Sequence, residues 1–497
     1  MRGVRVVLAL LGALVAALIA RPPATAAGPP GPVTNLQVKT GVGAALVSWS
    51  PPADDGGSPI IAYEVRSPNP TVIVTPPATS TVLTGLPATP LITIAVVADN
   101  ALGESPSAPV QVTVEGGGTY HALTPARILD TRDGTGGVPA APIGPSSSLS
   151  VQVAGRGGVP ASGVSAVVVN VTVTNTSASS FLTVFPTGTA RPLASNLNWM
   201  PGVTVPNLVT VGLGTGSRED VFNLSGTVDV IFDVAGWVGD NTNSSGPVGM
   251  FNSVTPARRF DTREGFGPLV GGSTLDLKLT GSAGVPTTGV NAVVLNVTVT
   301  NPTAPGFLTV WPSGAPRPLA SDLNFSAGQT VPNRVIATLG ANGQITIFNS
   351  QGFMDRVDVI VDVSGWFTDD TNRIGGSSLV TVVPNRVFDS RTNGNGPVQA
   401  GSSAHVFAGG THSLDGEAGA VVNVTAVGAT QPTFLTVWPD DGSPQPPTSD
   451  LNVAAGQTVP NLTFAGNVGF KVFNSAGAVD VVVDTDALLS RVVQPIT

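Results

Sequence analysis

The residues best suited to chemistry in this sequence are arginines and aspartates that recur in the same order three times. Each copy of a long segment opens on an Ala-Arg or Asn-Arg pair followed by Asp-Thr-Arg or Asp-Ser-Arg, and two further aspartates lie near its end. In the first copy these residues are Arg127, Asp130, Arg132, Asp229 and Asp233. Their counterparts are Arg258, Asp261, Arg263, Asp358 and Asp362 in the second copy, and Arg386, Asp389, Arg391, Asp480 and Asp484 in the third.

Three kinds of chemistry could use such a set. As a hydrolytic pair, Asp229 and Asp233 would lie about 13 Å apart on one strand, whereas glycosidase carboxylates need about 5 to 9.5 Å. A calcium site would need several oxygens on a flexible loop, and it stays open as an alternative. Both aspartates stand among apolar residues, where a lone carboxylate is costly. The pattern therefore favours structural ion pairs between the arginines that open each copy and the aspartates that close it.

No other constellation points to catalysis. The three histidines, His121, His405 and His412, have no counterparts across the copies, so they form no repeated acid-base or nucleophile arrangement. The chain has no cysteine, which excludes disulfides and thiolate metal sites. We therefore predict no catalytic residues, no metal, no cofactor and no enzyme activity.

Aromatic residues are the groups that a carbohydrate-binding protein would need. Phe185, Trp311 and Trp438 occupy one position in the three copies and each precedes a proline, which makes them candidates for a ligand platform. Core packing is the favoured alternative for them. Trp237 becomes Leu488 in the third copy, a change that a packing position tolerates.

Repeated asparagines lie where strands should meet turns. In the first copy they are Asn198, Asn207 and Asn223. Asparagine at such positions commonly bonds the local backbone, so turn chemistry is the expectation.

The elements that would position these residues are strands. Helical periodicity is nearly absent, and 60 glycines and 44 prolines interrupt the chain at intervals that leave room for strands alone. A β-branched run at 166–174, with polar residues at alternate positions in its second half, is typical of such a strand. We predict an all-β protein in which each copy is a β-sandwich or jelly roll.

The chain divides into five parts. A basic start, an apolar run at 6–20 and Ala24-Thr25-Ala26 predict an export signal peptide at 1–27, and hence a secreted protein with no later membrane span. A first unit follows at 28–115, and the three copies occupy 120–240, 251–369 and 379–491. Repeats this long predict folded domains instead of a solenoid of short units.

The first unit resembles a fibronectin type III domain. The resemblance rests on the Pro-rich start, Trp49 as the core tryptophan of the second strand and Tyr63 as the aromatic of the third. Ile92 stands where that family usually has a corner tyrosine. The resemblance implies a spacer of the kind found beside polysaccharide-degrading or cell-surface domains.

The triplicated segment resembles a repeat of secreted proteins of high-GC Gram-positive bacteria. The resemblance is carried by Ala-Arg-x-x-Asp-Thr-Arg, Ala-Val-Val-x-Asn-Val-Thr, Phe-Leu-Thr-Val-aromatic-Pro and Val-Pro-Asn. It implies no activity.

Composition indicates the class of partner. Charged residues are 11% of the chain, against about a quarter in typical domains, and the net charge is −9. Scattered basic residues argue against nucleic acid. A neutral surface of Thr, Ser, Asn and Gly suits a polysaccharide or another cell-envelope polymer, and a tandem module suits multivalent attachment. The alternatives are a structural or adhesive surface protein and an accessory subunit of a polysaccharide hydrolase. The oligomeric state, and whether the copies pack around a threefold axis or lie as beads, stay open.

Overall fold

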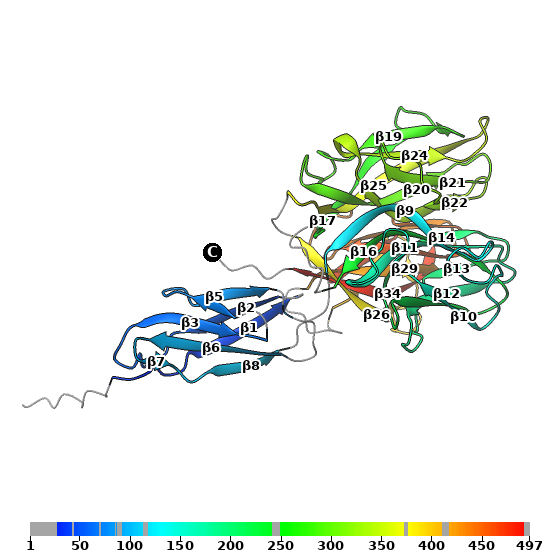
Figure 1. Ribbon diagram of the computed structural model, residues 1–497. Coiled ribbons are helices and arrows are strands. Elements are labelled where there is room, and N and C mark those ends of the chain that lie inside the picture. Colours follow the sequence, from blue (N-terminus) through cyan, green and yellow to red (C-terminus); the bar gives the residue numbers. More distant parts are fainter. Residues whose placement is uncertain are drawn as a thin grey trace, which may run out of the picture.

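The protein is almost entirely β-structure, as the sequence predicts (Figure 1). The computed structural model describes residues 27–41, 44–68, 71–84, 86, 92–112, 118–240, 249–371, 376–409 and 417–491. In these ranges the helical structure is one short 3-10 turn, η1 (Ala341–Gly343). No helix of the described ranges is long and apolar enough to cross a membrane. The predicted signal peptide, apart from Ala27, and His412 lie outside the described residues.

The first unit is a sandwich of two antiparallel sheets with the arrangement that the fibronectin type III resemblance implies. One sheet has the order β1-β2-β5 and the other β4-β3-β6, with β7 and β8 both paired to β6. Trp49 on β2 and Tyr63 on β3 are buried between the sheets, and their rings meet edge to face at 5.2 Å. Ile92 is buried in the same core. The strands are β1 (Thr34–Gly41), β2 (Ala44–Ser50), β3 (Ile60–Arg66), β4 (Val72–Val74), β5 (Ser80–Thr84), β6 (Ile92–Asn100), β7 (Gly103–Glu104) and β8 (Ala108–Val112).

Each of the three repeats, called modules 1 to 3 from here on, is a jelly roll. Counted from its own first strand, module 1 has an inner sheet of order 6-3-8-1 and an outer sheet of order 2-7-4-5, which is the strand order of a double Greek key. Module 1 contains β9 (Tyr120–Asp130), β10 (Ser147–Gln152), β11 (Val164–Thr174), β12 (Ser180–Pro186), β13 (Leu197–Trp199), β14 (Val205–Gly212), β15 (Arg218–Asn223) and β16 (Asp229–Gly239).

Modules 2 and 3 repeat this order and each adds one two-residue strand. Module 2 contains β17 (Phe251–Asp261), β18 (Leu269–Val270), β19 (Thr274–Lys278), β20 (Val290–Thr300), β21 (Gly306–Pro312), β22 (Leu323–Phe325), β23 (Val331–Thr338), β24 (Gln344–Asn349) and β25 (Arg356–Thr368). Module 3 contains β26 (Ser377–Asp389), β27 (Val398–Gln399), β28 (Ser402–Phe407), β29 (Glu417–Val427), β30 (Thr433–Pro439), β31 (Leu451–Val453), β32 (Thr458–Ala465), β33 (Gly469–Asn474) and β34 (Ala478–Arg491).

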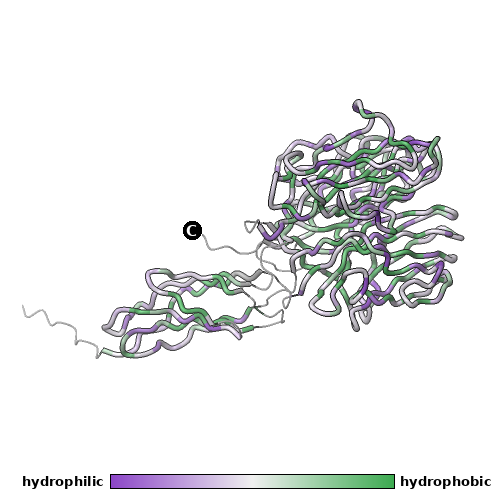
Figure 2. Tube along the Cα trace, turned by 45° about the horizontal axis from the view of Figure 1, so that its top comes forward, coloured by the Kyte–Doolittle hydropathy of each residue, from purple (hydrophilic) through white to green (hydrophobic). Residues whose placement is uncertain are grey.

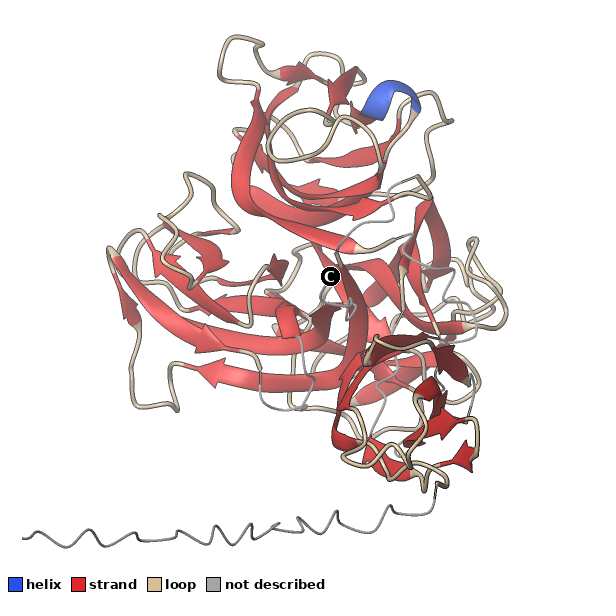
Figure 3. Ribbon diagram, turned by 90° about the vertical axis from the view of Figure 1, so that its left-hand side faces the viewer, coloured by secondary structure: helices blue, strands red, loops and turns tan. Residues whose placement is uncertain are grey.

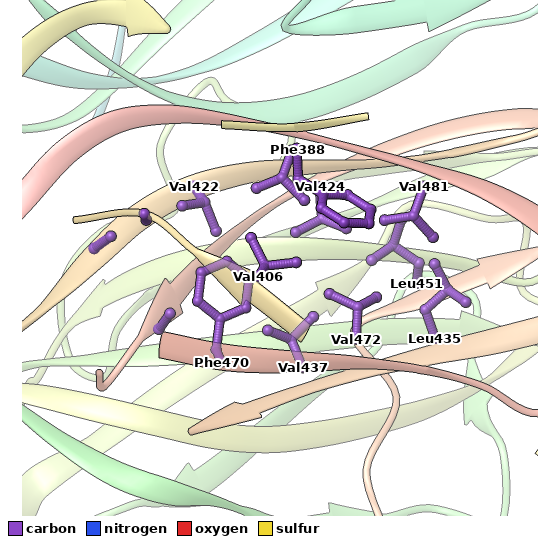
Figure 4. Close-up of a cluster of buried hydrophobic side chains, with 14 of the residues drawn as sticks. Phe388, Val406, Val422, Val424, Leu435, Val437, Leu451, Phe470, Val472 and Val481 are labelled. Atoms are coloured by element: carbon purple, nitrogen blue, oxygen red, sulfur yellow. The ribbon is translucent and has the colours of Figure 1, made fainter. Parts of the chain in front are cut away.

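A core of aliphatic side chains fills the space between the two sheets of each module. In module 3 (Figure 4), Val422 and Val424 of the inner sheet face Val437 and Val472 of the outer sheet. The strands alternate, so the opposite side chains of each sheet point away from this core. Figure 2 shows the apolar segments running along the strands inside the modules.

The modules do not hang as beads: they pack around a common axis, with their inner sheets turned toward it (Figure 3). A central cluster takes residues from all three, including Val168, Val294 and Val421, which occupy the same position of β11, β20 and β29. The first strands also meet, because Phe251 of β17 pairs with Ser377 of β26, and Gly118 bridges to Leu379.

In modules 1 and 2 a glycine of the last strand lies against an aromatic ring of the first strand at this axis, where a side chain would not fit. A Cβ on Gly236 would lie 2.2 Å from the Tyr120 hydroxyl, and one on Gly365 would lie 2.3 Å from the Phe251 ring. In module 3 the first-strand residue is Leu379 in place of an aromatic, and Ala487 stands where the glycine was. The repeats therefore carry matched pairs of side chains at the axis.

Candidate functional site

The repeated arginines and aspartates form the same network in every module, with buried aspartates and with a second arginine, Arg132 in module 1, that reaches solvent. In module 1, Nε and Nη2 of Arg127 donate to Oδ1 and Oδ2 of Asp233 at 2.9 and 3.2 Å, while Nη1 reaches Asp130 at 3.3 Å. Arg132 closes on Asp130 at 2.6 Å. Modules 2 and 3 reproduce the contact between the first and last strands with Arg258 on Asp362 at 3.0 Å and Arg386 on Asp484 at 2.9 Å. The second arginines, Arg263 and Arg391, lie 2.6 and 2.7 Å from Asp261 and Asp389.

Burial and pairing act in opposite directions on these carboxyls. For Asp130, burial alone would raise the pKa, but the side-chain and backbone hydrogen bonds of Arg132 outweigh it and lower the pKa. For Asp233, burial prevails over the Arg127 bonds and raises the pKa. One guanidinium holds both oxygens of Asp233, so this ion pair links the first and last strands of the module. The Asp233 carboxylate is therefore not free to carry protons to a ligand.

The outermost aspartates of the last strand differ from expectation. We expected arginine partners for Asp229, Asp358 and Asp480, and the structure gives them hydroxyl and amide partners. Asp229 accepts from Oγ1 of Thr131 at 2.9 Å and from Nδ2 of Asn175 at 2.8 Å. Asp358 accepts from the corresponding Thr262 and Asn301, and Asp480 from Ser390 at 2.7 Å. The Thr or Ser of the opening motif thus forms a second link to the last strand, in addition to the ion pair made by the first arginine.

The repeated asparagines create the junction between modules. The first is Asn170 of β11, whose Nδ2 donates to Ser321 O of module 2 at 2.6 Å and whose Oδ1 accepts from Asn333 at 2.8 Å. The same two bonds link Asn296 to module 3 through Ser449 and Asn461, and link Asn423 back to module 1 through Ser195 and Asn207. The ring of hydrogen bonds closes after three steps, as a head-to-tail interface with threefold rotation must.

This ring of hydrogen bonds changes the expectation that the repeated asparagines serve turns alone. We expected Asn207 and its counterparts to bond local backbone; each does donate to a backbone oxygen eleven positions away in its own module, Asn207 to Asn196 O at 2.7 Å, but each also bonds an asparagine of another module. Asn198 and Asn223 do make local bonds, to Ser195 at 3.1 Å and to Gly226 O at 2.9 Å.

The junction contains a charge asymmetry. Asn196, Asp322 and Asp450 occupy one position, and each accepts a hydrogen bond of 2.7 Å from the backbone of β12, β21 or β30. Asp450 is also paired at 2.6 Å with the fully buried Arg334 of module 2. The counterpart of Arg334 in module 1 is Leu208, which supplies no cation for Asp322.

The carboxyl of Asp322 is consequently perturbed. Burial raises its pKa to about 7, the bond from Val310 N opposes the rise, and the nearby Asp233 carboxylate adds to it. Asp322 is therefore a buried acid whose pKa lies near neutrality, at the contact where module 1 supplies no cation.

The three rings that the sequence offered as a ligand platform are buried. Phe185, Trp311 and Trp438 are 5, 6 and 5% exposed, and Nε1 of Trp311 donates to Ala315 O in the loop that folds over it. A stacking site needs an open ring face, so these three rings do not provide one. They are nevertheless outside the module cores, because the core residues of β12 are Leu182 and Val184. They lie on the outer face, defined as the side of the outer sheet that points away from the module core.

An accessible aromatic pair lies on the same outer face in every module. In module 1 Phe181 and Phe222 are half-buried with ring centroids 6.4 Å apart. Their counterparts are Phe307 and Phe348 in module 2, and Phe434 and Phe473 in module 3. Phe307 and Phe434 are 36 and 38% exposed. Exposed aromatic rings that recur at one position of a solvent-facing sheet make this face a candidate contact surface.

Loop residues complete the face in two modules. The guanidinium of Arg191 lies 3.9 Å from the centroid of the Phe222 ring, and Arg317 lies at the same distance from Phe348. Leu193 and Leu319, two residues further on, are 79 and 78% exposed. Module 3 has Gln445 in place of the arginine. In modules 1 and 2 the outer face thus combines aromatic and aliphatic surface with a guanidinium that lies over one of the two rings.

A hydrogen-bonded polar triplet lies beside each aromatic pair. In module 1, Thr187 donates to Asp220 at 2.8 Å and contacts Ser150 at 3.3 Å. Module 2 has Asp276, Ser313 and Thr346, and module 3 has His405, Asp440 and Lys471 at the same positions. Each triplet holds one carboxylate, and its position within the triplet changes from module to module. Such variation does not suit a repeated catalytic group.

Metal sites and histidines give no further site in the described ranges. No group of three His, Cys, Asp or Glu side chains there is placed to hold a metal ion. His121 stacks on Trp237 at 3.8 Å, and burial lowers its pKa.

Comparison with known proteins adds little to this geometry. No protein-family model and no curated protein matches the chain. Among solved structures, a two-domain fibronectin type III segment of chicken tenascin is 17% identical, with 42% of this chain and 97% of that chain covered and a TM-score of 0.20. A triple jelly-roll protein of an archaeal virus is 10% identical over 76% of this chain and 91% of that chain, with a TM-score of 0.17. Titin kinase with its flanking domains is 16% identical over 26% of this chain and 31% of that chain, with a TM-score of 0.16. At these TM-scores the likenesses carry no argument, and the architecture rests on the strand order.

Sequence reasoning missed the outer-face aromatics although a signal was present. Phe181, Phe307 and Phe434 open the repeated Phe-Leu-Thr-Val motif, and period-two alternation separates them from the core residue that follows. The second ring of each pair lies about forty residues further on, and only the pairing of β12 with β15 brings Phe222 near Phe181.

Proposed function

We propose that this protein is a secreted, non-catalytic binding protein that attaches to a cell-envelope or extracellular polymer, a glycan, through the three outer faces. The observation that carries the proposal is the accessible phenylalanine pair, repeated on all three outer sheets. Aromatic rings pack against the C–H faces of sugars, and neighbouring amides and hydroxyls serve the sugar hydroxyls. The low share of charged residues favours a neutral polymer.

The arrangement of the modules supports multivalent attachment. Packing around one axis turns the three outer sheets outward, so that each can meet a different stretch of polymer. Sites held on one rigid body gain avidity without new contacts. The fibronectin-like unit then serves as a spacer.

Co-sedimentation with insoluble polysaccharides tests the proposal. The triple variant Phe222→Ala, Phe348→Ala and Phe473→Ala removes one ring from every outer face and should abolish retention, while each single variant should weaken it less. Phe353→Ala is the matched control, since Phe353 is 82% exposed in the loop between β24 and β25. Retention of the triple variant at the wild-type level refutes the outer-face site. Release of soluble sugar by the purified protein refutes the non-catalytic assignment.

A second candidate function is adhesion through protein contacts. The same loop of module 2 projects Phe353 and Met354, which are 82 and 87% exposed. Such a pair on a loop tip favours an apolar contact with another protein. Concentration-dependent self-association that disappears in Phe353→Ser/Met354→Ser would support adhesion by contact between copies, and glycan binding alone would count against it.

A further inference from the structure

The three contacts between modules differ at one position of the inner sheets. Thr338, at the end of β23, donates to Leu123 O of module 1 at 3.2 Å. In module 3 the position is Gly466, as it is glycine in module 1, but here the backbone lies so close to Ser253 of module 2 that a Cβ on Gly466 would be 2.8 Å from the Ser253 Cβ. In module 1 the position is Gly212, which brings no side chain to the contact with module 3.

An open groove of about 460 Å³ lies at this contact. Its walls are two turns of module 1, at 186–189 and 212–215, and residues Thr381 to Val383 of β26. This volume falls within the range of roughly 300 to 1,000 Å³ that is typical of small-molecule sites.

The lining of the groove indicates the chemistry of its ligand. It contains no ionisable side chain. The lining holds the hydroxyls of Thr187, Thr189 and Thr381 and the aliphatic surface of Val382 and Val383, of which Val383 is 49% exposed. Thr187 and Thr189 donate to Asp220 and to Pro186 O, so their oxygens would serve a ligand as acceptors. A charged ligand would lose its hydration without gaining a counter-charge, whereas a ligand with hydroxyls and C–H faces would find partners for both.

The groove continues the outer face of module 1. Thr187 lines the groove and also donates to Asp220 of the polar triplet at 2.8 Å. Pro186, which lines the groove as well, ends β12, the strand that carries Phe181. The outer face of β12 is covered between Thr183 and Pro186, so the accessible path runs along the neighbouring β15, from Phe222 past Asp220 to Thr187 and the groove.

We propose that this groove is a second saccharide subsite, present in module 1, which holds a neutral segment of the glycan whose neighbouring sugars lie on the outer face. The proposal rests on the proposed function and deepens it, because it makes module 1 the module with the longest binding site.

The test variant replaces Gly212 with threonine, the residue that module 2 has at this position (Thr338), so that its side chain enters the groove. A Cβ on Gly212 would meet Thr381 Oγ1 at 3.6 Å and Pro186 Cγ at 3.7 Å, which are ordinary contacts, and Gly212 is not in a left-handed conformation. Gly212→Thr should therefore fold. The measurement uses the full chain with Phe348→Ala and Phe473→Ala, so that module 1 dominates the binding of soluble neutral oligosaccharides followed by calorimetry.

In that background Gly212→Thr should weaken the binding of the longest oligosaccharide by about tenfold, the equivalent of one or two lost hydrogen bonds. It should leave the shortest oligosaccharide unchanged. Gly144→Ala is the matched control, because its Cβ would meet Ser147 Oγ at 3.6 Å in a loop that does not line the groove. Equal affinities for Gly212→Thr and its parent, with binding lost in Phe222→Ala, overturn the groove and leave the outer face. Equal weakening by Gly144→Ala also overturns the groove. Absence of glycan binding by the unaltered protein overturns both proposals.

Discussion

Replacing Asp322 with asparagine should stabilise this protein at neutral pH and have little effect in acid. The carboxyl has an ordinary pKa of 3.8 when exposed and a pKa of about 7 in the fold. A folded pKa above the unfolded one gives stability that is complete below pH 4 and is lost as the pH rises toward 7. A rise of about three pKa units corresponds to about 4 kcal/mol. Asparagine does not ionise, and in module 1 Asn196 makes the same bond to its backbone partner at 2.7 Å.

Denaturant unfolding of Asp322→Asn and the wild type, from pH 4.5 to pH 8, measures this difference. The gap in unfolding free energy should be about 1 kcal/mol at pH 4.5 and grow to about 4 kcal/mol at pH 8. Asp450→Asn is the opposite control, because it strips Arg334 of its buried partner and should cost about 3 to 5 kcal/mol at every pH. A gap for Asp322→Asn that does not change with pH, or that favours the wild type at pH 8, would refute the reasoning.

Three further outcomes follow from buried polar groups. Glu219 has no hydrogen-bond partner for either carboxyl oxygen, and burial raises its pKa well above the usual range. Its counterpart is Ile345, so Glu219→Ile should raise the unfolding free energy by about 1 to 3 kcal/mol, and a lower thermal midpoint would contradict this. Asn333→Ala breaks one step of the junction and should cost about 2 to 3 kcal/mol, visible as faster hydrogen exchange in β14 and β23; unchanged exchange would count against the junction. Arg127→Ala leaves Asp233 buried without its partner and should lower the unfolding free energy by about 3 to 5 kcal/mol. This loss should shrink in acid, and an unchanged unfolding free energy would show that the ion pair does not stabilise the fold.

Much of the local structure could be read from the repeats. Alternation and turn residues predicted strands throughout, and the structure confirms them. The opening arginines were expected to contact the closing aspartates, and Arg127 does hold Asp233. Both inferences use short-range pattern or the cost of a lone buried charge, which are properties of residue type.

Partners that depend on the packing of modules could not be read in this way. Asn207 looks like a turn residue in its own repeat, and its bond partner Asn423 is more than two hundred residues away. The same holds for Arg334, whose partner Asp450 belongs to the next module. A repeat tells which residues recur, but not whether they recur for the fold of one copy or for contact between copies.

By itself, the sequence determined three homologous all-β modules behind a fibronectin-like unit and the ion pairs that close each module, because alternation and charge burial act within one strand or one sheet. The tertiary structure alone decided that the modules close a ring, that one contact carries an ion pair while another leaves an acid unpaired, and that paired phenylalanines reach the surface while the repeated Phe185, Trp311 and Trp438 do not. The physical reason is that rotation about a common axis brings together residues that no periodicity in the chain relates.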